Sequence, residues 1–212
     1  MNTNKLKLSL ILLMITVPIS LATMVYHFSG TDADFGSTSR GTLVLPVIDI
    51  TELKLLDAEG KPAYLSFEEL TANVSPDDYD PRPWQLLYLG SENCDAVCQE
   101  RLYFVRQLHI RLSGEAKRVQ RAYVVVGGEA VDAATLAYLQ QEQADMRILH
   151  VDPATLAAAL QRSVEPGVDP AASHYIYVMD PVGNIMLYFT PVNDAEAILK
   201  DVDKLLDQSS LG

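Results

Sequence analysis

Short apolar runs alternate with amphipathic segments through the second half of the chain. Runs of this kind are typical of buried strands, whereas apolar positions that recur every three or four residues indicate helices. The expected strands cover residues 85–89, 122–126, 146–151, 175–179 and 185–189. The expected helices cover residues 95–112, 132–141, 152–162 and 194–206. This order predicts an α/β fold in which parallel strands joined by crossover helices are followed by an antiparallel hairpin and a closing helix.

The preceding part of the chain adds short strands to this alternation. A strand is expected over residues 42–50, and residues 53–56 and 63–66 are the arms of a predicted hairpin with turn-forming residues between them. Residues 73–83 are rich in Pro and Asp and are expected to form a loop. Together these patterns predict a thioredoxin-like fold with an N-terminal β-hairpin extension, in one domain over residues 42–212.

Residues 1–28 are predicted to be a cytoplasmic stub followed by a single transmembrane helix. Lys5 and Lys7 precede residues 8–28, a run that contains no Asp, Glu, Lys or Arg. This run is about as long as the ~20 residues that a helix needs to cross a bilayer. Lysines of this kind mark the cytoplasmic side. In a bacterium, the remaining chain is therefore expected in the periplasm, tethered to the inner membrane.

A cleaved signal peptide is the alternative interpretation of this segment. Its apolar region would be residues 8–17, and residues 20–22 would be a cleavage site with small residues at both ends. The apolar run continues over residues 24–26, which favours the uncleaved anchor. Residues 29–41 form a polar linker rich in Gly, Ser and Thr. Both interpretations export the domain to a compartment where thiols can oxidise.

Charge and cysteine content exclude several classes of function. The chain carries 28 acidic and 16 basic residues, and a surface this acidic repels phosphate backbones, so nucleic acid is not expected as a partner. Two cysteines are too few for a disulfide scaffold, and too few alone for a structural zinc site with four ligands. The sequence contains no sign of a nucleophile triad, a phosphate-binding loop or a nicotinamide or flavin site.

The two cysteines stand where the first strand of the alternation meets its helix. Cys94 and Cys98 follow a polar loop over residues 90–93, at the kind of strand end where open α/β sheets place their chemistry. On a helix they would share one face with their Cα atoms about 6 Å apart, which a disulfide can span if the first turn adjusts. The helix N-terminus favours thiolate, whereas Glu92 and Asp95 oppose it. The pair is therefore predicted to form a reversible disulfide or to hold a soft metal such as Cu(I) with a third ligand.

Four histidines are the candidates for that third ligand. His27 belongs to the N-terminal apolar segment, and His109 is too far along the cysteine helix, so it is expected to be a satisfied core or boundary residue. His150 ends a strand predicted to run parallel to the strand before the cysteines. His174 begins a strand predicted to run antiparallel to it. Both therefore belong to the edge of the sheet that carries Cys94 and Cys98.

Three functions are compatible with this arrangement. The first is a metallochaperone that carries copper. The second is a thiol–disulfide oxidoreductase in which Cys94, being nearer the helix start and more exposed, attacks and Cys98 resolves. The third is a scaffold whose cysteines form a static bridge or remain inert.

The chain resembles the Sco/SenC family, which consists of membrane-anchored, thioredoxin-fold copper chaperones for cytochrome c oxidase. The resemblance lies in the predicted anchor, the CysXXXCys pair after a strand, and a late histidine before residues 175–184. Polar residues follow both cysteines where the family usually has prolines, so the chain is identified as a divergent member. The resemblance implies that Cys94, Cys98 and His174 bind copper. It also implies that the partner is the copper-site subunit of cytochrome c oxidase.

Overall fold

The computed structural model describes residues 3–28, 39–72, 82–127, 130–161, 168–169 and 171–209. The chain divides into two units, Met1–Thr38 and Ser39–Gly212, which are treated separately below. Nearly all of the predicted linker and of the predicted Pro- and Asp-rich loop lie outside the described residues.

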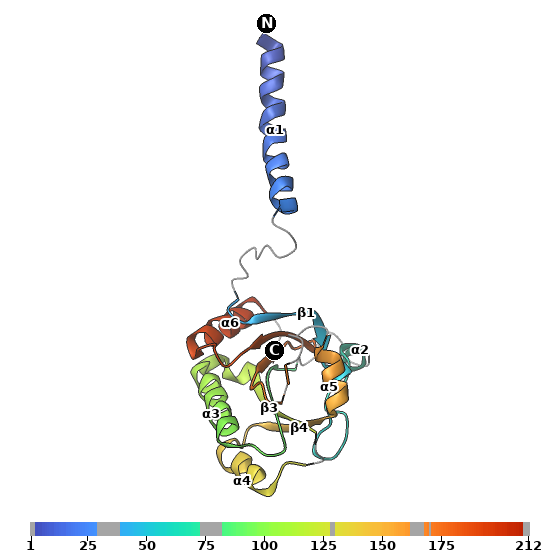
Figure 1. Ribbon diagram of the computed structural model, residues 1–212, viewed down its shortest axis with the longest axis vertical. Helices are drawn as coiled ribbons and strands as arrows, with labels where there is room; N and C mark the ends of the chain where they lie inside the picture. The colour runs from blue at the N-terminus through green and yellow to red at the C-terminus, as the bar shows by residue number, and fades with distance from the viewer. Residues whose placement is uncertain are drawn as a thin grey trace. The chain divides into compact units, whose positions relative to one another are not determined.

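The first unit contains one helix, α1 (Thr3–Phe28), among its described residues (Figure 1). Thr16 and Thr23 donate hydrogen bonds to the carbonyls of Leu12 and Ile19, one turn earlier, as hydroxyl side chains do in helices. The helix covers the range expected for the anchor. However, no helix in the described part of the chain combines the length and the apolar character that a membrane crossing requires. The prediction that α1 is a transmembrane helix is therefore not supported by the structure.

In the second unit, the described strands form one mixed sheet. They are β1 (Thr42–Asp49), β2 (Trp84–Gly90), β3 (Val119–Val126), β4 (Arg147–Val151), β5 (Ile176–Met179) and β6 (Asn184–Phe189). Their order across the sheet is β1-β6-β5-β2-β3-β4. β2, β3 and β4 run parallel, whereas β5 is antiparallel to β2 and to β6. The predicted strand directions are thus confirmed, and β2, which is buried at every position, lies at the centre.

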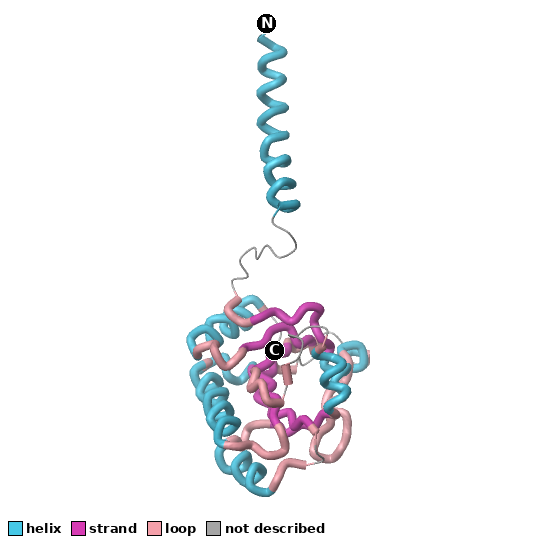
Figure 2. Tube along the Cα trace, viewed as in Figure 1, coloured by secondary structure: helices cyan, strands magenta, loops and turns pink. Residues whose placement is uncertain are grey.

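Helices lie on two sides of the sheet (Figure 2). They are α2 (Phe67–Thr71), α3 (Ala96–Arg111), α4 (Ala133–Glu142), α5 (Pro153–Leu160) and α6 (Ala195–Gln208). Each of the four long ones begins after an aspartate that accepts a backbone N–H from the first turn: Asp95, Asp132, Asp152 and Asp194. Such caps satisfy donors that the helix cannot pair internally, and they fix where each helix starts. Apolar residues of α3 and α6 pack on one face of the sheet, and those of α5 on the other.

The predicted N-terminal hairpin is not formed as expected. Ile50–Leu53 is a turn of 3₁₀-helix, and Leu56 makes only single-residue bridges, to Pro62 and to His150. Backbone hydrogen bonds flank this pair, from Asp57 to the carbonyl of Lys61 and from Ala63 to that of Leu55, but the pairing does not extend into strands. This segment therefore lies along β4, while β1 extends the opposite edge of the sheet by pairing with β6.

Candidate functional site

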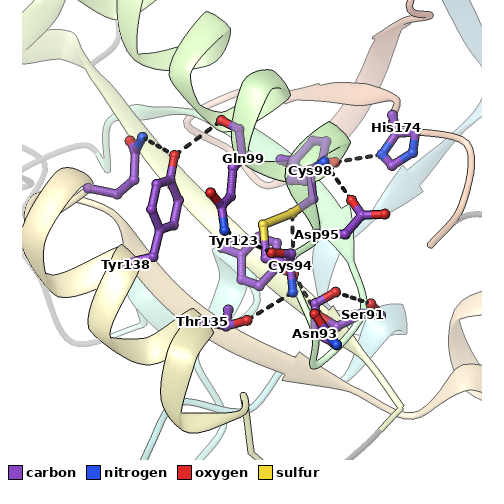
Figure 3. The surroundings of a disulfide bond; sticks show 12 residues. Ser91, Asn93, Cys94, Asp95, Cys98, Gln99, Tyr123, Thr135, Tyr138 and His174 are labelled. Carbon is purple, nitrogen blue, oxygen red and sulfur yellow. Dashed lines mark hydrogen bonds between the residues drawn. A yellow bond between two sulfur atoms is a disulfide. The ribbon is translucent and has the colours of Figure 1, made fainter.

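The cysteines lie at the junction of β2 and α3 and are joined by a disulfide (Figure 3). The carboxylate of Asp95 caps the helix by accepting the N–H of Cys98 at 3.0 Å. Cys98 is therefore in the first turn, whereas Cys94 precedes the cap and lies outside the helix. This places the two Cα atoms 5.2 Å apart, closer than the sequence spacing on a regular helix predicted.

The disulfide is part of the hydrophobic core beneath α3. Cys94 is 3% exposed and Cys98 is 5% exposed. The expectation that Cys94 is the more exposed thiol is therefore wrong. Cys94 belongs to the loop that leads into α3, because the helix begins only after it. In that loop it lies against the start of α4, where Thr135 contacts it.

Two side chains hold the backbone of Cys94. The hydroxyl of Thr135, in the first turn of α4, accepts the Cys94 N–H at 2.9 Å, and Gln99 donates to the Cys94 carbonyl at 3.1 Å. Asp132 in turn accepts the N–H of Thr135. In Figure 3, Thr135 lies on one side of the disulfide and His174 on the other. Thr135 was not predicted from the sequence, because it is remote in the chain and lies next to Cys94 only through the packing of α4.

Tyr123 of β3 supports the loop between β2 and α3. Its hydroxyl donates to the carbonyl of Ser91 and lies 3.8 Å from Sγ of Cys98. Burial raises the pKa of Tyr123, so the hydroxyl remains a donor at neutral pH. A Cβ atom at Gly90 would lie 2.7 Å from the Tyr123 ring. The close approach of strand and ring thus requires glycine at the end of β2.

His174 has an unusual backbone conformation and is held by contacts with Arg101 and Tyr88. Its backbone adopts a left-handed conformation (φ 55°), which is uncommon for a residue with a side chain. Its carbonyl accepts a hydrogen bond from Nε of Arg101 at 3.3 Å. Its Nδ1 lies 2.7 Å from the hydroxyl of Tyr88, and the two rings stack with centroids 6.3 Å apart. Burial raises the pKa of Tyr88, so this hydroxyl also stays protonated at neutral pH.

Cys98 and His174 line the same pocket, of about 280 Å³. Cys94 does not line it. The other lining residues are Tyr88, Gly90, Ser91, Asn93, Asp95, Asp169, Ala171 and Ala172. One cysteine of the disulfide, Cys98, therefore lines a space that it shares with a histidine.

The other histidines whose side chains are described lie elsewhere. His150 lines a separate pocket of about 490 Å³ beside Asp57 and Asp152, and β3 separates its strand from β2. Nε2 of His109 donates to the carbonyls of Ala116 and Val119, as expected for a satisfied boundary residue. The placement thus favours His174 over His150 as the neighbour of the cysteines.

The disulfide limits what this arrangement can do chemically. Metal ions bind the thiolate form of cysteine, and both sulfurs are bonded to each other. The described residues contain no group of three or more His, Cys, Asp or Glu positioned to hold a metal. Two electrons and two protons would convert the pair into two thiols. Two thiolates and one imidazole form a soft donor set that suits Cu(I).

A protein-family model described as "Transmembrane-like, thioredoxin-like, C-terminal domain" matches residues 84–209. This range covers the sheet from β2 onward, the disulfide and His174. A comparison with curated proteins finds no match.

Several solved structures share the fold. Arabidopsis thaliana ScoI with copper bound is 16% identical, with a TM-score of 0.50 over 81% of this chain and 100% of that one. Yeast Sco1 with copper bound is 16% identical, with a TM-score of 0.51 over 82% of this chain and 96% of that one. Apo Sco1 from Thermus thermophilus is 18% identical, with a TM-score of 0.52 over 80% of this chain and 99% of that one. At these identities the likeness shows the fold, and it confirms the predicted thioredoxin-like architecture.

Proposed function

Because the chain belongs to the family of transmembrane-like, thioredoxin-like C-terminal domains, we propose that it is a divergent Sco-like copper carrier. In its reduced form it binds Cu(I) as cargo through Cys94, Cys98 and His174, for assembly of the copper site of cytochrome c oxidase. The observation that carries this proposal is the Cys94–Cys98 disulfide, whose residue Cys98 lines a pocket together with His174. Two proteins of the same fold, from Arabidopsis and yeast, have structures with copper bound, which supports the choice of metal.

Copper binding in this proposal depends on the redox state of the pair. Reduction adds two electrons and two protons to the disulfide and leaves two thiols. Cu(I) then replaces the thiol protons, so binding releases protons and the sulfurs become thiolate ligands. Imidazole is a suitable third ligand for copper, and His174 lines the same pocket as Cys98, which supports this role for it.

Titration of both redox forms with Cu(I) against a chromogenic chelator tests the proposal. We expect the reduced protein to bind one Cu(I) and the oxidised protein to bind none. In the reduced protein, His174→Ala should lower the affinity by at least ~10-fold, the loss that even the outer-sphere partner of a metal ligand can cause.

His150→Ala is the matched control, since His150 lies in another pocket. The Cu(I) affinity of this variant should equal that of the wild type. Copper binding by the oxidised form, or equal losses in the two histidine variants, would contradict the assignment of the site.

The proposed cellular location is an oxidising compartment, such as the bacterial periplasm. A disulfide persists in such compartments and is rare where glutathione and thioredoxin keep thiols reduced. The copper-site subunit of the oxidase is proposed as the partner, on the basis of the motif resemblance.

The position of Cys98 favours thiol–disulfide exchange as a second candidate function. A partner's thiolate would reach Sγ of Cys98 through the pocket, form a mixed disulfide with it, and release Cys94 as a thiolate that then takes up a proton. This reverses the roles that the sequence suggested, because Cys98 lines the pocket and Cys94 does not.

Single-cysteine variants test this order of attack with glutathione disulfide as the probe. Cys94→Ser leaves Cys98, and it should form a mixed disulfide roughly tenfold faster than Cys98→Ser, because exchange rates depend on access to the attacking sulfur. Mass spectrometry of quenched samples measures both rates. Equal rates, or faster reaction of Cys98→Ser, would argue against Cys98 as the exchanging residue.

A further inference from the structure

The hydrogen bond between Tyr88 and His174 occupies a ring nitrogen that the proposed copper site needs. We propose that the Tyr88 hydroxyl is a latch on His174: it holds Nδ1 in the oxidised protein, and copper must displace it to bind. This inference rests on the proposed function and adds a regulating residue to the same site.

Nδ1 of His174 lies 2.7 Å from the hydroxyl of Tyr88, and Tyr88 lines the pocket together with Cys98 and His174. In Figure 3, the dashed line from His174 leaves the ring on the side of the cysteines. A copper ion bound to the sulfurs would therefore meet the ring at the position where the hydroxyl now bonds.

Neither residue is free to move away easily. Tyr88 is fully buried in the central strand β2, and its ring stacks on that of Tyr123. The backbone of His174 is held by Arg101, which also donates to the carbonyl of Thr190. The contact is therefore between two fixed groups, and it persists until something replaces one of them.

Breaking this contact has a cost that copper must offset. The Tyr88 hydroxyl and Nδ1 of His174 are hydrogen-bond partners, and the imidazole tautomer sets which of them donates. If copper takes Nδ1, the buried hydroxyl loses that partner in either case, and a buried polar group without a partner is unfavourable. Tyr88 should therefore weaken copper binding and ease the release of copper to an acceptor, as a carrier requires.

The latch predicts that removing the Tyr88 hydroxyl changes the Cu(I) affinity in the opposite direction to the loss of a group that only positions a ligand. If Tyr88 only positioned His174, its removal would weaken copper binding. If it competes with copper, Tyr88→Phe should strengthen Cu(I) binding by the reduced protein by roughly tenfold, since the phenylalanine ring keeps the packing but has no hydroxyl to displace.

A double-mutant cycle on the reduced full chain tests the latch with Cu(I) alone as the probe. Tyr88→Phe should raise the affinity in the wild type and leave it unchanged in the His174→Ala background. Tyr177→Phe is the matched control, because Tyr177 is an equally buried tyrosine that packs in the core on the other face of the sheet, and it should not reproduce the gain.

The outcomes separate the two proposals. Binding by the wild type with unchanged or weaker affinity in Tyr88→Phe overturns the latch alone. A gain that persists without His174 also overturns it. Absence of Cu(I) binding by the reduced wild type removes both the latch and the proposed function.

Discussion

Replacing either cysteine by serine is expected to abolish Cu(I) binding by the fully reduced protein. Cys94 and Cys98 supply two of the three proposed ligands, and a serine hydroxyl is a hard, protonated oxygen that does not substitute for a soft thiolate. The bound copper should fall from one per chain to none that survives competition with the chelator. Elemental analysis after gel filtration measures this directly.

The serine variants should remain folded, so a loss of binding can be interpreted. The disulfide closes a loop with a sequence separation of only 4 residues, and a loop this short stabilises the folded state by about 2 kcal/mol in the chain-entropy view. Circular dichroism and denaturant unfolding provide the control. A folded Cys94→Ser or Cys98→Ser protein that keeps one tightly bound copper would show that the metal binds elsewhere.

Gly90→Ala is expected to have the largest effect on stability among the substitutions next to the site. The added Cβ would lie 2.7 Å from both the ring and the hydroxyl oxygen of Tyr123. Tyr123 is fully buried in β3, so the ring has no space to retreat. Overpacking of this kind costs roughly 1–3 kcal/mol. Displacement of Tyr123 would also break its bond to Ser91 and disturb the loop that carries Cys94.

Chemical denaturation of Gly90→Ala measures this cost, with Gly114→Ala as the matched control. A Cβ atom at Gly114 meets nothing within 4 Å, so its free energy of unfolding should stay within ~0.5 kcal/mol of the wild type. The same small change in both variants would mean that the approach of Tyr123 to β2 does not constrain the strand. After reduction, slower re-formation of the Cys94–Cys98 disulfide in Gly90→Ala than in the wild type would further link this packing to the site.

Much of the fold could be predicted because its signals are local. Asp132 and Asp152 are caps whose side chains bond within their own first turn, so the helix starts follow from nearby residues. The directions of β4 and β5 follow from the order of strands and helices. The predicted hairpin is reduced to a single pair, Leu56 with Pro62, because the N–H and carbonyl of Leu56 both bond to His150, a partner distant in sequence.

The candidate site was predictable only in part, for the same reason. Cys94 and Cys98 stood out by spacing, and topology placed His174 at their edge of the sheet. The residues that fix them, Thr135 and Tyr88, belong to α4 and β2 and carry no motif of their own. Their roles follow from burial and from single hydrogen bonds, which are properties of the packed structure.

X-ray absorption spectroscopy at the copper edge of the reduced, Cu(I)-loaded protein tests the central proposal most directly. It counts the atoms bound to copper and distinguishes sulfur from nitrogen. We expect two sulfur ligands and one nitrogen ligand in the wild type, and loss of the nitrogen in His174→Ala but not in His150→Ala. A first shell without nitrogen, with a single sulfur, or with a nitrogen that remains in His174→Ala would contradict a copper site formed by Cys94, Cys98 and His174.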